Sequence, residues 1–175
     1  MIEAWRITKR RHADLTGSGA KMAGGRWNSR GFVVVYCADH PALAALEVRV
    51  HLDLPPELLP DDFVLMKLEL PYESPEAVKT IPTAPRACGD DWIAQARTAV
   101  LRVPSILVPE AFNYLLNPAH PAAAEARLIN IKPFSFDARL WGPQPQRKPA
   151  GRQLRCLPDA GAPVAHRARA SSIRE

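Results

Sequence analysis

The amino-acid sequence predicts an α+β fold, in which a mixed or antiparallel sheet forms the core of a single compact domain flanked by short helices. Short apolar segments recur along the chain, one with the clear two-residue period of a strand, and two further segments have helical character. The chain has 175 residues, of which 47% are hydrophobic, and this is the size and composition of one globular domain.

Five segments are predicted as strands. The clearest spans residues 63–71, where apolar and charged residues alternate as in a half-buried antiparallel strand. Residues 32–38 (FVVVYCA) are almost continuously apolar, which is typical of a central strand. Pro104 and Pro109 confine the strand predicted at residues 100–109 to an edge, a bulge or a break in the ladder. The other two segments are residues 5–8 and 126–136.

Two helices are predicted. The first spans residues 39–52, with Asp39 as its candidate N-cap and Pro41 in its first turn. The second spans residues 89–100 and opens with two aspartates, which suit the positive end of the helix dipole. The proline-rich region between Pro71 and Gly89 is predicted to be a loop that forms a rim or a lid.

The formal charge of +5 is concentrated near the C-terminal end of the sequence. Residues 141–175 hold seven of the 23 Lys and Arg residues and two of the 18 Asp and Glu residues, so residues 1–140 carry 16 of each sign. We therefore divide the chain into a neutral domain at 1–140 and a basic tail at 141–175. The tail is rich in Pro, Ala and Arg without an apolar period, which predicts disorder. It is either a solvated extension or a basic arm for nucleic acid or a partner, and its composition favours the extension.

Composition also restricts the class of protein. The longest apolar run is far shorter than the roughly 20 residues of a membrane helix, so we expect a soluble, unexported, cytoplasmic protein. The cysteines, Cys37, Cys88 and Cys156, are odd in number and form no C-x-x-C pair, which argues against a disulfide framework. The five histidines show no metal-binding spacing, and we expect no metal site.

One carboxylate stands out within the first predicted helix. Glu47 continues a 4, 3, 4 spacing of apolar residues that comprises Leu43, Val50 and Leu54, so it is predicted to share their buried face. A buried carboxylate acquires partners or becomes neutral, and such groups concentrate at functional sites. The alternative is that Glu47 lies at the edge of the stripe and pairs with His51 at the surface.

The segment AGGRWN supplies a candidate cation. Gly24 and Gly25 permit close backbone approach, and they precede Arg26, whose guanidinium suits phosphate groups. The alternative is an ordinary glycine turn with a solvent-facing arginine. The preceding TGSGAKM is not a phosphate-binding loop, because Met22 occupies the position of the required Ser or Thr.

From Trp5 to Leu140 the chain resembles the RES-domain family, which is named for Arg, Glu and Ser and known as toxins of Xre/RES type II toxin–antitoxin systems. The motifs that carry the resemblance, in order, are WRI, GGRWNSRG, VVYCA, ALAALEVRVHL, LPDDFVL, GDDWIAQARTAVLRVPS, VPEAFNYLLNPAHP and PFSFDARL. Singly none is specific, but together they are. Typical members end soon after a motif like FDARL, so the basic tail departs from the pattern.

The resemblance implies a fold similar to ADP-ribosyltransferases and an enzyme that consumes NAD. Its characteristic reaction is phosphorolysis of the nicotinamide glycosidic bond, which yields nicotinamide and ADP-ribose-1″-phosphate. NAD hydrolysis and protein ADP-ribosylation are alternatives at the same site. NAD is then a substrate and inorganic phosphate a co-substrate, with no bound cofactor expected.

The family's functional residues fall on Arg6, Arg26, Tyr36, Glu47 and Ser105. A carboxylate such as Glu47 stabilises the oxocarbenium-like ribose as the bond breaks. The two arginines suit the pyrophosphate and the attacking phosphate, in a division that the sequence leaves open. We therefore take as catalytic candidates Glu47, Arg6 and Ser105, and as substrate-binding candidates Arg26, Tyr36 and Asn113.

Three of the four remaining candidates have a structural alternative. Tyr36 stacks on the substrate or is a core aromatic residue. Ser105 bonds a substrate oxygen or satisfies a broken strand ladder. Asn113, in FNYLLNP, lines the same cleft or terminates a helix, and the residues alone favour the helix.

The resemblance also implies partners. The expected partner is a cognate Xre-like antitoxin that blocks the pocket entrance, in a homo-oligomer or a toxin–antitoxin hetero-oligomer. Nucleic acid is not expected to bind directly, except through the antitoxin or the tail, and no membrane is expected to bind. A function of another class is a non-catalytic interaction module whose basic tail binds nucleic acid or a partner.

Overall fold

A computed structural model describes residues 1–72 and 75–142, and it confirms the predicted α+β class. Its centre is a seven-stranded sheet with the order β4-β5-β6-β2-β1-β3-β7. All neighbouring strands are antiparallel except β4 and β5, which are parallel. The predictions for residues 143–175 lie outside the described residues.

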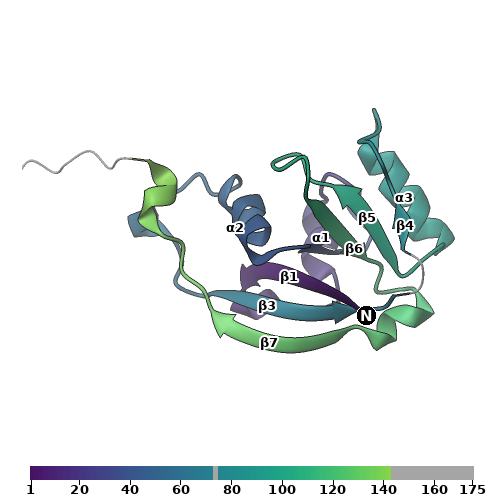
Figure 1. Cartoon of the computed structure of the whole chain (residues 1–175), viewed down its shortest axis with the longest axis horizontal. Helices are drawn as coiled ribbons and strands as arrows, with labels where there is room; N and C mark the ends of the chain where they lie inside the picture. The colour runs from purple at the N-terminus through teal and green to yellow at the C-terminus, as the bar shows by residue number, and fades with distance from the viewer. Residues whose placement is uncertain (73–74, 143–175) are drawn as a thin grey trace, which may run out of the picture. The chain divides into compact units, whose positions relative to one another are not determined.

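The described residues form seven strands, three α-helices and several short 3₁₀ turns (Figure 1). The strands are β1 Ile2–Lys9, β2 Val35–Ala38, β3 Phe63–Leu70, β4 Glu76–Ala77, β5 Val100–Pro104, β6 Phe112–Leu116 and β7 Arg127–Pro133. The helices are α1 Ser18–Ala23, α2 Pro41–Arg49 and α3 Pro85–Gln95. The 3₁₀ turns are η1 Arg10–His12, η2 Pro56–Leu58, η3 Pro121–Glu125 and η4 Ala138–Trp141.

Alternation in β3 places one face of this strand in the core, as predicted. The apolar side chains of that face are fully buried, and they are Val64, Met66, Leu68 and Leu70. A second cluster joins α3 to the sheet, because Trp92 and Ile93 pack with Leu101 of β5 and Leu115 of β6. The core thus holds the sheet and α3 together as one unit.

The helix that carries Glu47 is shorter than the sequence predicts. α2 ends at Arg49, and its N-cap is His40, whose side chain accepts a hydrogen bond from the backbone N–H of Ala42 at 3.2 Å. Asp39, predicted as the cap, instead accepts from the N–H of Phe112 at 2.8 Å. Because the helix ends early, Leu54 lies beyond it and is 44% exposed.

The predicted buried stripe on this helix is therefore wrong in its second half. Val50 is 49% exposed, whereas the residues of α2 that are buried are Leu43 and Ala44. Glu47 is half-buried and lies one turn after Leu43 and Ala44, on the same face of the helix, so the predicted position of this carboxylate is retained.

Three further predictions are corrected. The second helix begins at Pro85 and ends at Gln95, where Ala96 adopts a left-handed conformation with φ 45°, so its two aspartates lie in mid-helix. The predicted loop therefore contains the first turns of α3 and the short strand β4. The segment FNYLL is strand β6, not the end of a helix.

The sheet opens between β1 and β2. β1 pairs with β3 over eight residues, but it pairs with β2 at one position, where Trp5 lies opposite Ala38. Strand-to-strand hydrogen bonding is thus interrupted near the middle of the sheet, and side chains of both strands face the space that remains.

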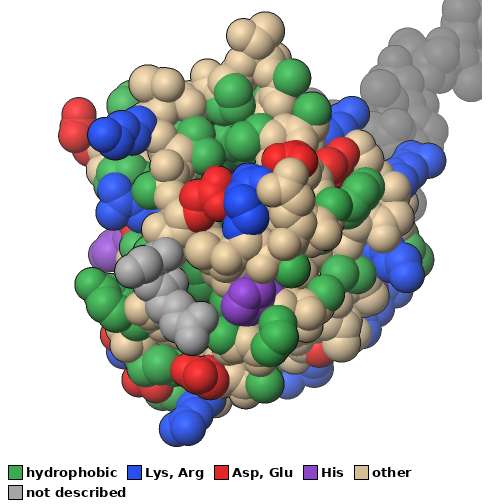
Figure 2. Space-filling view, turned by 90° about the vertical axis from the view of Figure 1, so that its right-hand side faces the viewer, with side chains coloured by type: hydrophobic (Ala, Val, Ile, Leu, Met, Phe, Trp, Pro, Cys, Tyr) green, Lys and Arg blue, Asp and Glu red, His purple; other side chains and the backbone are tan. Residues whose placement is uncertain are grey.

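The surface of the domain mixes charges of both signs. Figure 2 shows acidic, basic and apolar side chains adjoining one another on the face that it displays, without an extended field of one sign. Within the described part of the chain, no helix has the length and apolar character needed to cross a membrane.

Candidate functional site

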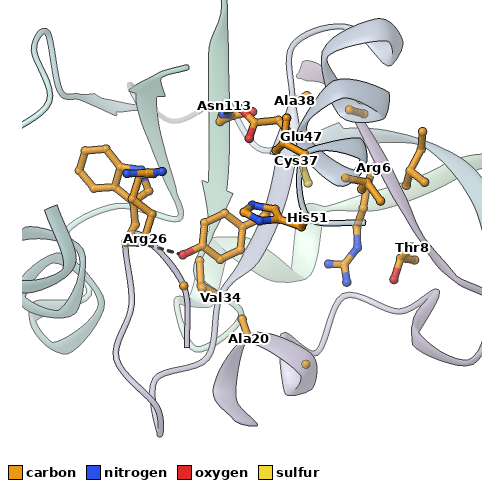
Figure 3. A pocket seen from close by; sticks show the side chains of 18 of the residues that line it. Arg6, Thr8, Ala20, Arg26, Val34, Cys37, Ala38, Glu47, His51 and Asn113 are labelled. Carbon is orange, nitrogen blue, oxygen red and sulfur yellow. Dashed lines mark hydrogen bonds between the residues drawn. The ribbon is translucent and has the colours of Figure 1, made fainter. Parts of the chain in front are cut away.

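A pocket of about 520 Å³ lies where β1 and β2 separate, within the roughly 300–1,000 Å³ range of small-molecule sites. Its walls come from β1, the α1 region, β2, α2 and the β5–β6 connection (Figure 3). The charged and hydrogen-bonding side chains around it are Arg6, Thr8, His12, Arg26, Tyr36, Glu47, His51 and Asn113. Five of the six predicted site residues therefore line one cavity.

Glu47 is held by two side chains from the neighbouring strand region. Its Oε1 accepts a hydrogen bond from Asn113 Nδ2 at 2.6 Å and another from Ser105 Oγ at 3.0 Å. Among the described residues no ion pair or hydrogen bond joins Glu47 to His51, to Arg6 or to Arg26. The predicted surface pair with His51 is therefore absent from that part of the chain, and amide and hydroxyl groups hold the carboxylate.

Ser105 supports Glu47 from behind. Its side chain is 3% exposed, and it is not one of the residues that line the pocket. Its Oγ also accepts from the backbone N–H groups of Leu107 at 3.1 Å and Val108 at 3.2 Å. One hydroxyl thus closes the turn after β5 and donates to the carboxylate, so Ser105 combines a backbone role with a polar partner at the site.

Asn113 reaches Glu47 because β6 is a strand. In the β2–β6 ladder Asn113 lies opposite Ala38, and in the β5–β6 ladder it lies opposite Val103. This register places its amide on the face of the sheet that α2 covers. The sequence favoured a helix end here, and the strand explains why Asn113 lines the pocket instead.

Tyr36 lines the same pocket with its ring, while its hydroxyl is bonded to the protein. The hydroxyl accepts from the N–H of Trp27 at 3.1 Å and donates to Asn28 Oδ1 at 2.7 Å. Burial of the ring raises the pKa of Tyr36 to about 12, so it is a neutral phenol at physiological pH.

The Tyr36 hydroxyl also explains one glycine of the AGGRWN segment. A Cβ on Gly25 would lie 2.5 Å from that hydroxyl and 2.8 Å from Asn28 Oδ1, so no larger residue fits. The close approach brings Arg26 to the wall of the pocket. Asn28, which sequence reasoning missed, is fully buried.

The two arginines occupy different parts of the pocket. Arg6 of β1 is half-buried and Arg26 is exposed. In Figure 3 they lie on opposite sides of the pocket, with His51 between them in this view. Within the described residues neither forms an ion pair, so both guanidinium groups are available to an anionic ligand.

Cys37 and His51 also line the pocket but were not predicted as site residues. Burial raises the pKa of the Cys37 thiol to about 12, which keeps it protonated and unreactive. The described residues bring together no group of three His, Cys, Asp or Glu side chains that would hold a metal ion.

Comparison with known proteins gives a consistent set of relatives. The RES domain family matches residues 3–137. A Pseudomonas putida protein named Toxin Res is 37% identical over 145 residues, covering 78% of this chain and 98% of its own. A Sphingobium protein named Prs ADP-ribosylating toxin is 38% identical over 141 residues, covering 73% and 86%. The crystal structure of the M. tuberculosis MbcT–MbcA toxin–antitoxin complex matches with a TM-score of 0.64 and 17% identity, over 76% of this chain and 84% of that one.

Proposed function

The chain belongs to the RES domain family, and we propose that it is the toxin of a toxin–antitoxin pair and breaks the nicotinamide glycosidic bond of NAD. The observation that carries this proposal is the arrangement at Glu47. One carboxylate oxygen is fixed by Ser105 and Asn113 at the wall of a pocket that also contains two arginines without ion-pair partners in the described residues.

Bond cleavage leaves neutral nicotinamide and a positively charged, oxocarbenium-like ribose. A preorganised carboxylate stabilises that charge without having to reorient during the reaction. Because Oε1 of Glu47 already accepts two protein hydrogen bonds, we assign its Oε2 to the ribose. Ser105 and Asn113 then contribute by holding the carboxylate in place, and Ser105 acts as a positioning residue.

The arginines have the chemistry to bind the anionic parts of the reactants. Arg6 and Arg26 lie on different walls, so one meets the pyrophosphate of NAD and the other meets an attacking phosphate. The acceptor we propose is inorganic phosphate, which gives ADP-ribose-1″-phosphate. The 38% identity to a protein named Prs ADP-ribosylating toxin supports a second candidate, in which a protein side chain is the acceptor.

Proton NMR of NAD incubated with the purified protein tests the reaction. Release of nicotinamide that requires phosphate, together with ADP-ribose-1″-phosphate, is the expected result. Release without phosphate indicates hydrolysis. Transfer of labelled ADP-ribose from NAD to an added protein indicates ADP-ribosylation. The absence of release under all three conditions would refute the proposed chemistry.

A matched pair of variants tests the role of Glu47. Glu47→Gln keeps the size and one acceptor but removes the charge, and we expect nicotinamide release to fall at least about a hundredfold. Glu57→Gln is the control, because Glu57 is exposed in η2 and does not line the pocket. Full activity of Glu47→Gln would assign the reaction to another group.

The partner we propose is an Xre-like antitoxin that covers the pocket entrance. Support comes from the structural match to a toxin–antitoxin complex. Expression of the chain alone is expected to stop bacterial growth, and expression of Glu47→Gln or co-expression of the cognate antitoxin is expected to restore it. If Glu47→Gln still arrests growth, toxicity does not result from NAD cleavage at Glu47.

A further inference from the structure

The segment that carries Arg26 is attached to α3 across a long sequence separation. The backbone N–H of Ser29 donates to Asp90 Oδ1 at 2.7 Å, and its hydroxyl donates to Asp90 Oδ2 at 2.6 Å. Near the other end of the segment, Arg86 Nε donates to the carbonyl oxygen of Gly25 at 3.1 Å. Both bonds of Asp90 and the bond of Arg86 span 61 residues.

A third contact lies between these two. Gly89 is buried, and a Cβ added to it would lie 1.8 Å from the carbonyl oxygen of Trp27. The backbone of α3 therefore rests directly against the backbone of the Arg26 segment. Positions 86, 89 and 90 follow the three- and four-residue spacing of one helix face, so a single face of α3 holds residues 25–29.

The neighbouring aspartate has a different environment. Asp91 forms an ion pair with Arg97 at 2.8 Å and accepts a hydrogen bond from Gln95 at 2.6 Å, and its side chain is 57% exposed. In the described part of the chain no hydrogen bond or ion pair joins Asp91 to residues 25–29. The two adjacent acids on α3 thus have separate structural roles.

We propose that Asp90 is a positioning residue for substrate binding, which fixes Arg26 at the pocket wall by holding Ser29. This inference rests on the proposed function, in which Arg26 meets an anionic part of the reactants. Arg26 lies between Gly25, bonded to Arg86, and Ser29, bonded to Asp90. Because the backbone on both sides of Arg26 is already fixed, binding of a phosphate group orders only the Arg26 side chain and not the segment that carries it.

Steady-state kinetics of three variants tests this role. Asp90→Ala removes both acceptors of Ser29, and we expect the KM of the anionic reactant that Arg26 binds, NAD or phosphate, to rise about tenfold with a smaller change in kcat. Asp90→Asn retains an oxygen for the Ser29 N–H and is expected to recover most of the affinity. Asp91→Ala is the matched control and should leave both parameters unchanged. Circular dichroism at the assay temperature verifies that each variant is folded.

A double-mutant cycle separates positioning from general destabilisation. If Asp90 acts through Arg26, then Asp90→Ala adds no further rise in KM when Arg26 is already replaced by alanine. If the increases in KM caused by the two substitutions multiply in the double variant, the proposal is overturned, because Asp90 then affects KM independently of Arg26. A KM unaffected by Asp90→Ala for both NAD and phosphate would also overturn it.

Trypsin provides a readout that does not depend on the reaction. Arg26 is exposed, and cleavage after it requires the segment to detach from α3. We expect faster cleavage after Arg26 in Asp90→Ala than in Asp91→Ala or the unmodified protein. If Asp90→Ala is cleaved faster but the unmodified protein releases no nicotinamide, the proposed function is refuted, whereas the attachment of residues 25–29 to α3 is supported. Unchanged cleavage would overturn the attachment itself.

Discussion

Ser105 and Glu47 lie 58 residues apart in the chain, and the hydroxyl of Ser105 donates a hydrogen bond to Glu47 Oε1 at 3.0 Å. The same hydroxyl accepts from two backbone N–H groups in the turn that follows β5. The turn therefore orients the hydroxyl, and the hydroxyl orients the carboxylate. The backbone conformation of the turn after β5 therefore determines the orientation of the carboxylate that we propose as catalytic.

Replacement of Ser105 by alanine is predicted to reduce both stability and kcat. Two N–H groups and one carboxylate oxygen lose a partner, and each buried group left unsatisfied costs about 1–3 kcal/mol. Urea denaturation measures the loss of stability, and nicotinamide release measures kcat. Ser105→Thr retains a hydroxyl and is expected to recover part of kcat. A kcat equal to that of the unmodified protein in Ser105→Ala would show that Asn113 alone suffices to orient Glu47.

Replacement of Asn28 by aspartate is predicted to be strongly destabilising although the two side chains have the same shape. Asn28 is fully buried, and its Nδ2 donates to the carbonyl oxygens of Ala20 at 3.0 Å, Ser29 at 3.1 Å and Phe32 at 3.2 Å. A carboxylate would present a negative oxygen to these three acceptors, which we expect to cost roughly 3 kcal/mol or more. Urea denaturation measures this difference.

Asn117→Asp is a useful comparison for that variant. Asn117 is also fully buried, but its Nδ2 has a single long bond of 3.4 Å to the carbonyl oxygen of Ile93. We expect a smaller loss of stability there. Equal losses at the two positions would indicate that burial of charge, and not the three acceptors around Asn28, determines the cost.

Secondary structure was predictable where the periodicity was unambiguous. The alternation in residues 63–71 identified β3 and its buried face because a strand repeats every two residues. The FNYLL segment is too short for its period to distinguish a strand from the end of a helix, and its assignment as β6 depends on pairing with β2 and β5. Likewise, the spacing of apolar residues predicted a helix that continues to residue 52, whereas α2 ends at Arg49, because this spacing does not indicate where a helix leaves the core.

The sequence predicted which residues line the pocket better than it predicted the hydrogen bonds that orient them. The carboxylate position and the glycine pair drew attention to Glu47 and Arg26, the resemblance to the RES-domain family selected them as candidates, and both line the pocket. The partners that orient them were not predicted in these roles. Ser105 contacts Glu47 across 58 residues and Asp90 contacts Ser29 across 61, and such distances are set by the tertiary fold alone.

The Tyr36 hydroxyl is predicted to give the domain a pH-dependent stability at alkaline pH. Its pKa is about 12 in the folded protein and about 10 in an unfolded chain, so the folded state retains the proton more tightly. The stabilisation is fully present below about pH 10 and is lost as the pH rises towards about 12. The Tyr36→Phe variant has no hydroxyl to titrate at this position, so the stability advantage of the unmodified protein over it should shrink across that window.

Urea denaturation of both proteins at pH 8 and pH 11 measures this change. Tyr114 and Cys37 also have raised pKa values, but both are present in the two proteins, so their effects cancel in the difference. An advantage that is constant from pH 8 to pH 11 would contradict the raised pKa of Tyr36.

Replacement of Arg49 by alanine is predicted to loosen the end of α2 that follows Glu47. The Arg49 guanidinium lies 4.0 Å from the centre of the Trp141 ring, and it donates to the carbonyl oxygens of Leu140 at 3.2 Å and Leu52 at 3.3 Å. These contacts join η4 to the turn after α2, which lines the pocket through His51 and Leu52. We expect a loss of about 1–3 kcal/mol and a fall of several degrees in Tm.

Two variants make the role of Arg49 specific. Arg49→Lys retains the charge near Trp141 but lacks the planar fork that reaches two carbonyl groups, so it should recover only part of the stability. Arg139→Ala is the control, because Arg139 lies in the same η4 segment with a 91% exposed side chain and pairs with Asp137 two residues away. Calorimetry should show a Tm within about a degree of the unmodified protein for this control. Similar falls in Tm for Arg49→Ala and Arg139→Ala would show that the contact with Trp141 does not hold the end of α2.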